Sequence, residues 1–313
     1  MADIWQNPRQ SFIRAPLAAL AYPAKPVEVM EHILDWSLLH VGRSIARDPD
    51  VGLTAWADLA GVLRKQKPEL WKKYQPRTWD EGAYLWGSVA CSVNLGGTLL
   101  AKAVRDAEEL TTWLIKTGAM RKPGSWEGVN TFTMTMNGMG ERNSWWDAMH
   151  GVRAQGKGGS VNRSDGQLSW DEFRVYAAIL SVTGEKQWGR CTREDIAARA
   201  AGWVGVKART KAEPMEIERR RAAGLMLSDK AVRLTVDYLE NSGRLAKVRW
   251  GHRTVFFGVG MKPDELRQKI ATMMKERALA MGRAKTNRRS DLEWTRQVRG
   301  EIAAEKANRQ TAL

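Results

Sequence analysis

Cationic side chains gather in one short stretch of the chain, residues 245–257. Two runs rich in β-formers, 245–250 and 254–257, flank a turn that begins with glycine, and this pattern predicts a two-stranded β-hairpin. The hairpin carries Lys247, Arg249, His252 and Arg253. Ammonium and guanidinium groups on an exposed ribbon can bind phosphate oxygens. We therefore predict that the hairpin contacts a phosphate backbone.

The segment before the hairpin, residues 228–241, has the signals of an amphipathic helix. Ser228 is a favourable N-cap, and Gly243 can adopt the left-handed conformation that ends a helix. The apolar positions on its inner face are Val232, Val236 and Leu239. Lys230 and Arg233 fall on the outer face, where a helix in the major groove contacts base edges.

Two further helices precede this one. Ser169 and Glu172 form an S-x-x-E capping box before an apolar helical pattern, and Thr192 is placed to cap a short helix over residues 193–202. Three helices followed by a charged hairpin are the element order of a winged helix-turn-helix.

The spacing between the second and third helices leaves an alternative open. A helix-turn-helix turn normally has three or four residues, but residues 203–227 intervene here. Either the domain carries a basic insertion, or the recognition helix is the segment 214–223. That segment would present Arg219, Arg220 and Arg221.

The sequence of the N-terminal half predicts four helices and one strand. The expected helices cover residues 26–45, 54–63, 83–93 and 98–116, and the expected strand covers residues 132–136. The fold class we predict is mainly α with small β-hairpins (α+β), built as two winged-helix-like domains plus C-terminal helices. The expected parts are an N-terminal domain (1–150), a Gly-rich linker (151–167), a DNA-binding domain (168–260) and basic C-terminal helices (261–313). The last part begins at Pro263, with Leu266, Ile270, Met273 and Met274 as an apolar stripe.

Net charge differs sharply between the two halves. Up to Val152 the chain has 17 Lys and Arg against 16 Asp and Glu, whereas from Arg153 onward it has 33 against 19. A positive charge confined to one half suits a polyanionic partner, most often nucleic acid.

Patterns typical of catalysis, metal binding or membranes are missing from the sequence. Cys91 and Cys191 have no zinc spacing, the four histidines show no metal motif, and there is no G-x-S-x-G. A GxxxxGK match at 151–157 is followed by Gly158 instead of Ser or Thr. We expect a protein that is not an enzyme, needs no cofactor or metal, makes no membrane contact and works in a reducing cytoplasm; an enzyme site assembled from distant residues is the weakest rival.

The two halves also resemble each other locally. Residues 111–122 align with residues 236–247 at a constant offset of 125, so that Trp113 matches Tyr238 and Gly118 matches Gly243. Both segments read as a helix, a small cap, a glycine and a strand, which suggests two winged helices in tandem.

Such a tandem arrangement, with its basic C-terminal half, resembles the plasmid replication initiators that bind repeated origin sequences. The resemblance covers most of the chain through architecture and charge and has no signature motif. It implies a plasmid or phage initiator that binds duplex DNA through the C-terminal domain, forms a homodimer through the N-terminal one and recruits host replication proteins. The alternatives are a winged-helix transcriptional regulator, and a nucleoprotein that coats RNA or DNA without sequence preference.

Overall fold

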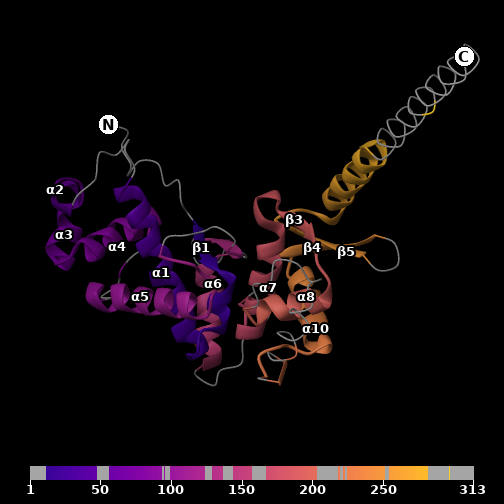
Figure 1. Ribbon diagram of the computed structural model, residues 1–313, viewed down its shortest axis with the longest axis horizontal. Coiled ribbons are helices and arrows are strands. Elements are labelled where there is room, and N and C mark those ends of the chain that lie inside the picture. Colours follow the sequence, from indigo (N-terminus) through magenta and orange to yellow (C-terminus); the bar gives the residue numbers. More distant parts are fainter. Residues whose placement is uncertain are drawn as a thin grey trace, which may run out of the picture. The chain divides into compact units, whose positions relative to one another are not determined.

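The structure is a computed structural model that describes residues 12–47, 56–93, 95, 99–123, 129–136, 144–156, 167–202, 218, 221–222, 224–250, 254–280 and 296. The chain forms two compact units, one up to Met261 and one from Lys262 to Leu313, and each is described by itself. The described part is mainly helical with small antiparallel sheets, as the sequence predicts (Figure 1).

Helices dominate the N-terminal half of the first unit. They are α1 (Pro26–Ala46), α2 (Trp56–Gln66), α3 (Pro68–Tyr74), α4 (Trp79–Ala90), α5 (Leu100–Lys116) and α6 (Trp145–Gly156). Helix α1 packs along both α4 and α5, and its apolar face, including Trp36, is buried. The sequence predicted α1, α2, α4 and α5 but neither α3 nor α6.

Helices α1 and α4 touch backbone to backbone. A Cβ atom added to Gly42 would lie 1.7 Å from the carbonyl oxygen of Ala83, and one added to Gly87 would lie 1.9 Å from that of Leu38. Only glycine permits this approach, because any side chain would overlap the opposite backbone.

A two-stranded sheet lies in the same half. Strand β1 (Phe12–Pro16) pairs antiparallel with β2 (Thr131–Thr135), in a register that sets Ile13 opposite Met134. The 3-10 helix η1 (Leu17–Ala21) follows β1, and most of it is buried. The sequence predicted β2 to within one residue but not β1.

The expected Gly-rich linker begins later than its composition indicated. Residues 151–156 are the end of α6, and residues 157–166 lie outside the described part. Gly151 faces the next segment closely, since a Cβ there would lie 2.1 Å from the carbonyl oxygen of Leu168. This glycine therefore serves close packing and not a flexible connection.

The C-terminal half of the first unit contains the predicted helices and hairpin. Its elements are α7 (Trp170–Thr183), η3 (Gly184–Lys186), β3 (Trp188–Arg190), α8 (Arg193–Ala200), α10 (Asp229–Asn241), β4 (Leu245–Trp250) and β5 (Thr254–Val259). The short β3, which the sequence did not predict, joins the hairpin in an antiparallel sheet with the order β3-β5-β4. Helices α7, α8 and α10 pack against one another beside this sheet (Figure 1).

Caps fix the beginnings of these helices as predicted. Ser169 and Glu172 form a reciprocal capping box at α7, and Thr192 forms one with Asp195 at α8. Ser228 accepts a hydrogen bond from the backbone N–H of Ala231 at the start of α10. Each cap satisfies backbone donors that the helix itself leaves unpaired.

One hydrophobic core extends through both halves of this unit. The Phe173 ring on α7 meets Trp145 of α6 at a centroid distance of 5.6 Å and Phe132 of β2 at 6.1 Å, both edge-on. The same core continues through α8 and α10 into the hairpin. That residues 1–150 and 168–260 are two separate domains stays a prediction.

The internal repeat is borne out at the helix ends but not beyond them. Helices α5 and α10 are both followed by a glycine with φ of +73°, Gly118 and Gly243. Strand β4 begins directly after the second glycine, whereas residues 119–123 after the first form bends and turns. The strand that we expected there is wrong, and a winged helix in the N-terminal half stays a prediction.

The second unit contains the helix predicted from Pro263. Residues 263–280 are helical, with Leu266 and Ile270 buried and Met273 and Met274 half-buried. Among all described helices, none combines the length and the apolar character needed to cross a bilayer.

Candidate nucleic-acid interface

Helix α10 presents a polar face with one apolar residue in it. Val232, Val236 and Leu239 are buried, while Lys230 and Arg233 are exposed, as predicted. Leu234 lies among the exposed residues, with 52% of its surface accessible. An exposed leucine on a helix that could enter a major groove can contact a thymine methyl group.

Carboxylates on α10 are neutralised by cations from other elements. Asp229 pairs with Arg193 at the start of α8, with 2.7 Å between Oδ2 and Nη1. Asp237 and Glu240 both pair with Lys247 of β4, each at 2.7 Å. The carboxylates of α10 are therefore compensated by cations and do not leave the helix with a negative surface that would repel a polyanion.

Lys247 ties the hairpin to α10. Burial alone would lower the pKa of its ammonium group, but hydrogen bonds to Asp237 and Glu240 raise that pKa above the ordinary lysine value. The sequence predicted a contact between this lysine and DNA; in the structure its charge is shared between two carboxylates and it positions β4 against α10.

Three other cations that the sequence predicted as DNA contacts are accessible to a ligand. Lys230 and Arg233 on α10 and Arg249 on β4 are exposed. Within the ranges that the structure describes, none of them forms an ion pair with a carboxylate. Their charge is thus free to meet phosphate oxygens or base edges.

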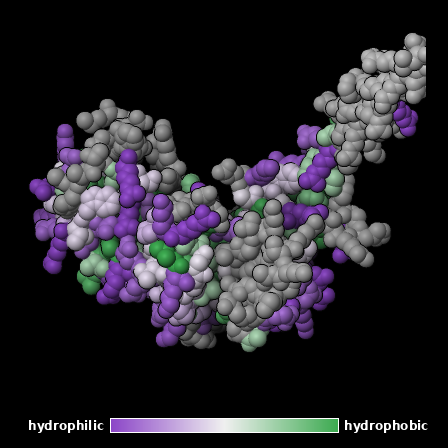
Figure 2. All heavy atoms as spheres, in the orientation of Figure 1, coloured by the Kyte–Doolittle hydropathy of each residue, from purple (hydrophilic) through white to green (hydrophobic). Residues whose placement is uncertain are grey.

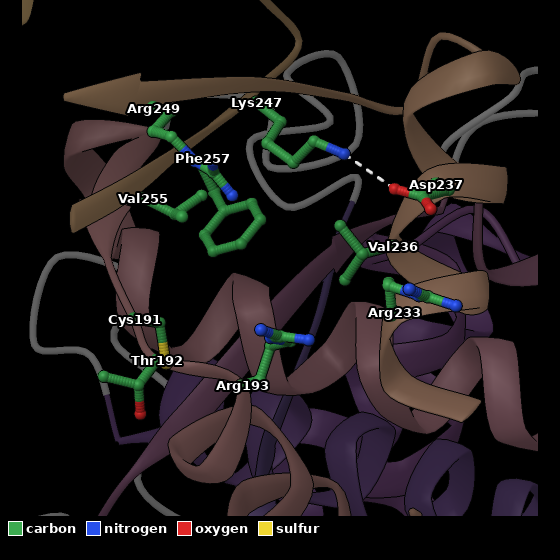
Figure 3. A pocket seen from close by; sticks show the side chains of 10 residues that line it. All are labelled: Cys191, Thr192, Arg193, Arg233, Val236, Asp237, Lys247, Arg249, Val255 and Phe257. Carbon is green, nitrogen blue, oxygen red and sulfur yellow. Dashed lines mark hydrogen bonds and ion pairs between the residues drawn. The ribbon is translucent and has the colours of Figure 1, made fainter. Parts of the chain in front are cut away.

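A pocket of about 720 Å³ lies between α8, α10 and the hairpin (Figure 3). Its lining residues are Cys191, Thr192, Arg193, Arg233, Val236, Asp237, Lys247, Arg249, Val255 and Phe257. Arg193 and Lys247 of this lining are paired with carboxylates of α10, so its net positive charge comes from Arg233 and Arg249, which have no carboxylate partner in the described part of the chain. A concave surface concentrates the potential of such charges. The pocket brings together Arg233, Lys247 and Arg249 of the predicted site and adds Arg193.

The pocket's thiol is not a reactive group. Cys191 is 6% exposed, and burial raises its pKa to about 12. Burial also raises the pKa of Cys91 to about 12. Both thiols are therefore protonated at neutral pH and pack as small apolar side chains.

The alternative recognition segment, 214–223, is described only in part. Arg221 pairs with Glu218 and lies 3.9 Å from a carboxylate oxygen of Glu194. Arg219 and Arg220 lie outside the described residues, as do His252 and Arg253 at the hairpin tip. Which of the two segments, 214–223 or 228–241, is the recognition helix therefore stays a prediction.

One group of side chains has the composition of a cation site. His32, Asp106 and Glu109 place one ligand atom each within 4.8 Å of one another, on α1 and α5. Lys102 already binds Asp106, and Arg105 lies 3.7 Å from Glu109. These internal cations neutralise the carboxylates, so the group is a salt-bridge network. Its members lie too far apart in sequence for motif spacing to reveal them.

Comparison with protein-family models, with curated proteins and with solved structures finds no match to this chain. Interpretation of the interface therefore depends on its own residues. Sequence reasoning missed two of them, Arg193 and Leu234. The helical pattern could have revealed Leu234, because it is off the apolar face of α10, whereas Arg193 reaches the pocket only through the packing of α8 on α10.

Proposed function

We propose that the protein binds duplex DNA in a sequence-specific manner and that the segment from α7 to β5 acts as a winged helix-turn-helix. The observation that carries the proposal is the open face of α10, where Lys230, Arg233 and Leu234 are exposed next to a cationic pocket bounded by the hairpin. Helix order and the β3-β5-β4 sheet order support the same reading.

In this proposal α10 enters the major groove and the hairpin follows the backbone. Arg233 can donate two hydrogen bonds to a guanine edge, and Leu234 can contact a thymine methyl. Arg249 and the cations at the hairpin tip bind phosphates, which adds affinity without sequence preference. Lys247 keeps the hairpin at a fixed position relative to α10 through Asp237 and Glu240.

The biological role we propose is initiation of plasmid or phage replication at repeated sites, with binding in place of catalysis. Support comes from the charge distribution and from the matching ends of α5 and α10. A homodimer that places two copies of α10 on a repeated site, and recruitment of host replication proteins, belong to this role.

The test is selection of a random duplex pool by the full-length protein, followed by titration of the selected and scrambled duplexes. We expect one motif to be enriched and bound 10³-fold or more tightly than scrambled duplex, on the order of specific binders generally. Equal binding of all duplexes, or of RNA and DNA alike, would overturn sequence-specific recognition and favour a coat protein.

A further inference from the structure

A second basic surface lies on α2 and α3, in the half of the chain whose total charge is close to zero. Residues 64–77 contain six Lys and Arg and one carboxylate, Glu69. Over the whole half up to Val152, Lys and Arg exceed Asp and Glu by only one. The near-neutral total therefore hides a local concentration of positive charge.

Most of these cations are exposed and have no carboxylate partner. Arg64, Lys65, Lys72, Lys73 and Arg77 are all exposed. None of these five forms an ion pair within the part of the chain that the structure describes. Hydrophilic side chains project over α2 and α3 in the space-filling view (Figure 2).

Local helix energetics explain only part of this arrangement. Lys and Arg near a helix C-terminus interact favourably with the helix dipole, by about 0.3–1 kcal/mol each. Arg64 and Lys65 end α2, and Lys72 and Lys73 end α3. Like charges gathered on one surface repel one another, so two cations at each of these two helix ends exceed what the dipoles require.

Aromatic rings hold two of these cations against the surface. The Arg64 guanidinium lies 4.7 Å from the centre of the Trp71 ring, and the Lys73 ammonium lies 5.0 Å from that of Tyr74. Both rings also pack against the hydrophobic core. The rings are therefore occupied within the protein, which disfavours base stacking and leaves charge as the means of recognition.

We infer that the exposed cations of α2 and α3 bind the phosphodiester backbone of nucleic acid, without sequence preference and separately from α10. The proposed DNA binding supplies only the choice of partner. The charge and its exposure are properties of the surface itself, as is the lack of carboxylate partners among the described residues. A chain that contacts DNA at two surfaces gains affinity from the second without changing which sequence the first selects.

The experiment compares the full-length protein with the triple variant Lys65→Gln, Lys72→Gln, Lys73→Gln. A matched control replaces three exposed cations at and after the end of α5, as Lys116→Gln, Arg121→Gln, Lys122→Gln, and so removes the same charge from the same half. Affinity is measured against salt concentration for a selected duplex, a scrambled duplex and a single strand. Circular dichroism melting confirms that both variants fold.

We expect the α2–α3 variant to lose about tenfold or more in affinity for selected and scrambled duplex alike, and the log-log salt slope to shrink by about 2.7. The control is expected to change the slope much less. A parallel loss on single strands would assign the site to either form of the backbone, and an unchanged single-strand affinity would assign it to the duplex.

Equal slopes for the variant and the control would overturn the inference. So would retained DNA affinity together with lost binding to phosphatidylserine vesicles, which would make the surface a membrane contact. Failure of the proposed function looks different: the wild type would then select no motif, while its non-specific affinity would still fall in the α2–α3 variant.

Discussion

Single side chains decide which charges of the C-terminal half can meet a ligand. Lys247 is surrounded by Asp237 and Glu240, whereas Lys230 is exposed without a carboxylate partner in the described part of the chain. The two lysines look alike in the sequence, because both belong to the basic half. Their different roles follow from the fold, which brings β4 beside the carboxylates of α10.

Replacing Lys247 with Met should therefore cost stability, while the same change at Lys230 should not. The Lys247→Met protein leaves two partly buried carboxylates close together, and we expect a loss of about 1–2 kcal/mol in the free energy of unfolding. Lys230→Met is expected to stay within about 0.5 kcal/mol of wild type. Urea denaturation measures both, and equal stabilities of the two variants would contradict the positioning role.

Asp35 and His40 give the N-terminal half opposing pH dependences. Burial raises the pKa of Asp35, whose carboxylate accepts a 2.6 Å hydrogen bond from Tyr84, to about 7. Burial lowers the pKa of His40 to about 4. Between the ordinary carboxyl pKa and pH 7 the folded state keeps a proton on Asp35 that the unfolded chain has released, so stability falls as pH rises. For His40 the unfolded chain binds the extra proton, so stability rises with pH until the ordinary histidine pKa is passed.

Asp35→Asn should remove the first of these effects. We expect the variant and wild type to have equal free energies of unfolding near pH 4. As pH rises wild type loses stability and the variant does not, so that at pH 8 the variant is more stable than wild type by about 2–4 kcal/mol. Urea denaturation across this pH range measures the difference, with Asp58→Asn on the exposed side of α2 as the control. A constant difference between Asp35→Asn and wild type at every pH would show that Asp35 does not titrate in this way.

Among the secondary-structure elements, the crossing of α1 and α4 sets the geometry of the N-terminal half. Gly42 and Gly87 remove the side chains that would otherwise separate the two helices. Gly61 in α2 has a different environment, since a Cβ there would meet nothing within 4 Å. The same residue type thus serves close packing in one helix and has no packing role in the other.

Gly42→Ala is accordingly expected to destabilise the protein by about 3 kcal/mol or more, because the new methyl group would force the helices apart. Gly61→Ala should stabilise it by about 0.5–1 kcal/mol through helix propensity. Thermal melts of the two variants give the comparison. Similar melting temperatures would mean that α1 and α4 do not pack as closely as described.

Local signals in the sequence predicted the elements of the C-terminal half better than those of the N-terminal half. Ser228 and Gly243 mark the ends of α10 within a few residues of it, and the hairpin follows at once. Strand β1 could not be predicted in this way, because its partner residues in β2 lie more than a hundred positions away, as Phe12 does from Thr135. Helix α6 was missed because Gly151 is typical of a linker until its contact with Leu168 is known.

In the molecule as a whole, the hydrophobic core and the exposed cations occupy different parts of the described chain. The hydrophobic core extends from the N-terminal half through Phe173 into the hairpin, while exposed cations without a carboxylate partner in the described part of the chain lie on α2–α3, on α10 and on β4. Of the candidate site, the sequence predicted the exposed Lys230, Arg233 and Arg249. It could not predict the engagement of Lys247 or the contribution of Arg193, since both depend on how α8, α10 and β4 pack.

Binding of selected and scrambled duplexes by Arg233→Ala and Arg249→Ala tests the proposed function most directly. We expect Arg233→Ala to weaken the selected duplex by about 1–3 kcal/mol more than the scrambled one, because it removes a base contact. Arg249→Ala should weaken both equally and reduce the salt slope by about 1, because it removes a phosphate contact. Uniform loss in both variants, or no loss in either, would contradict recognition of DNA sequence by α10.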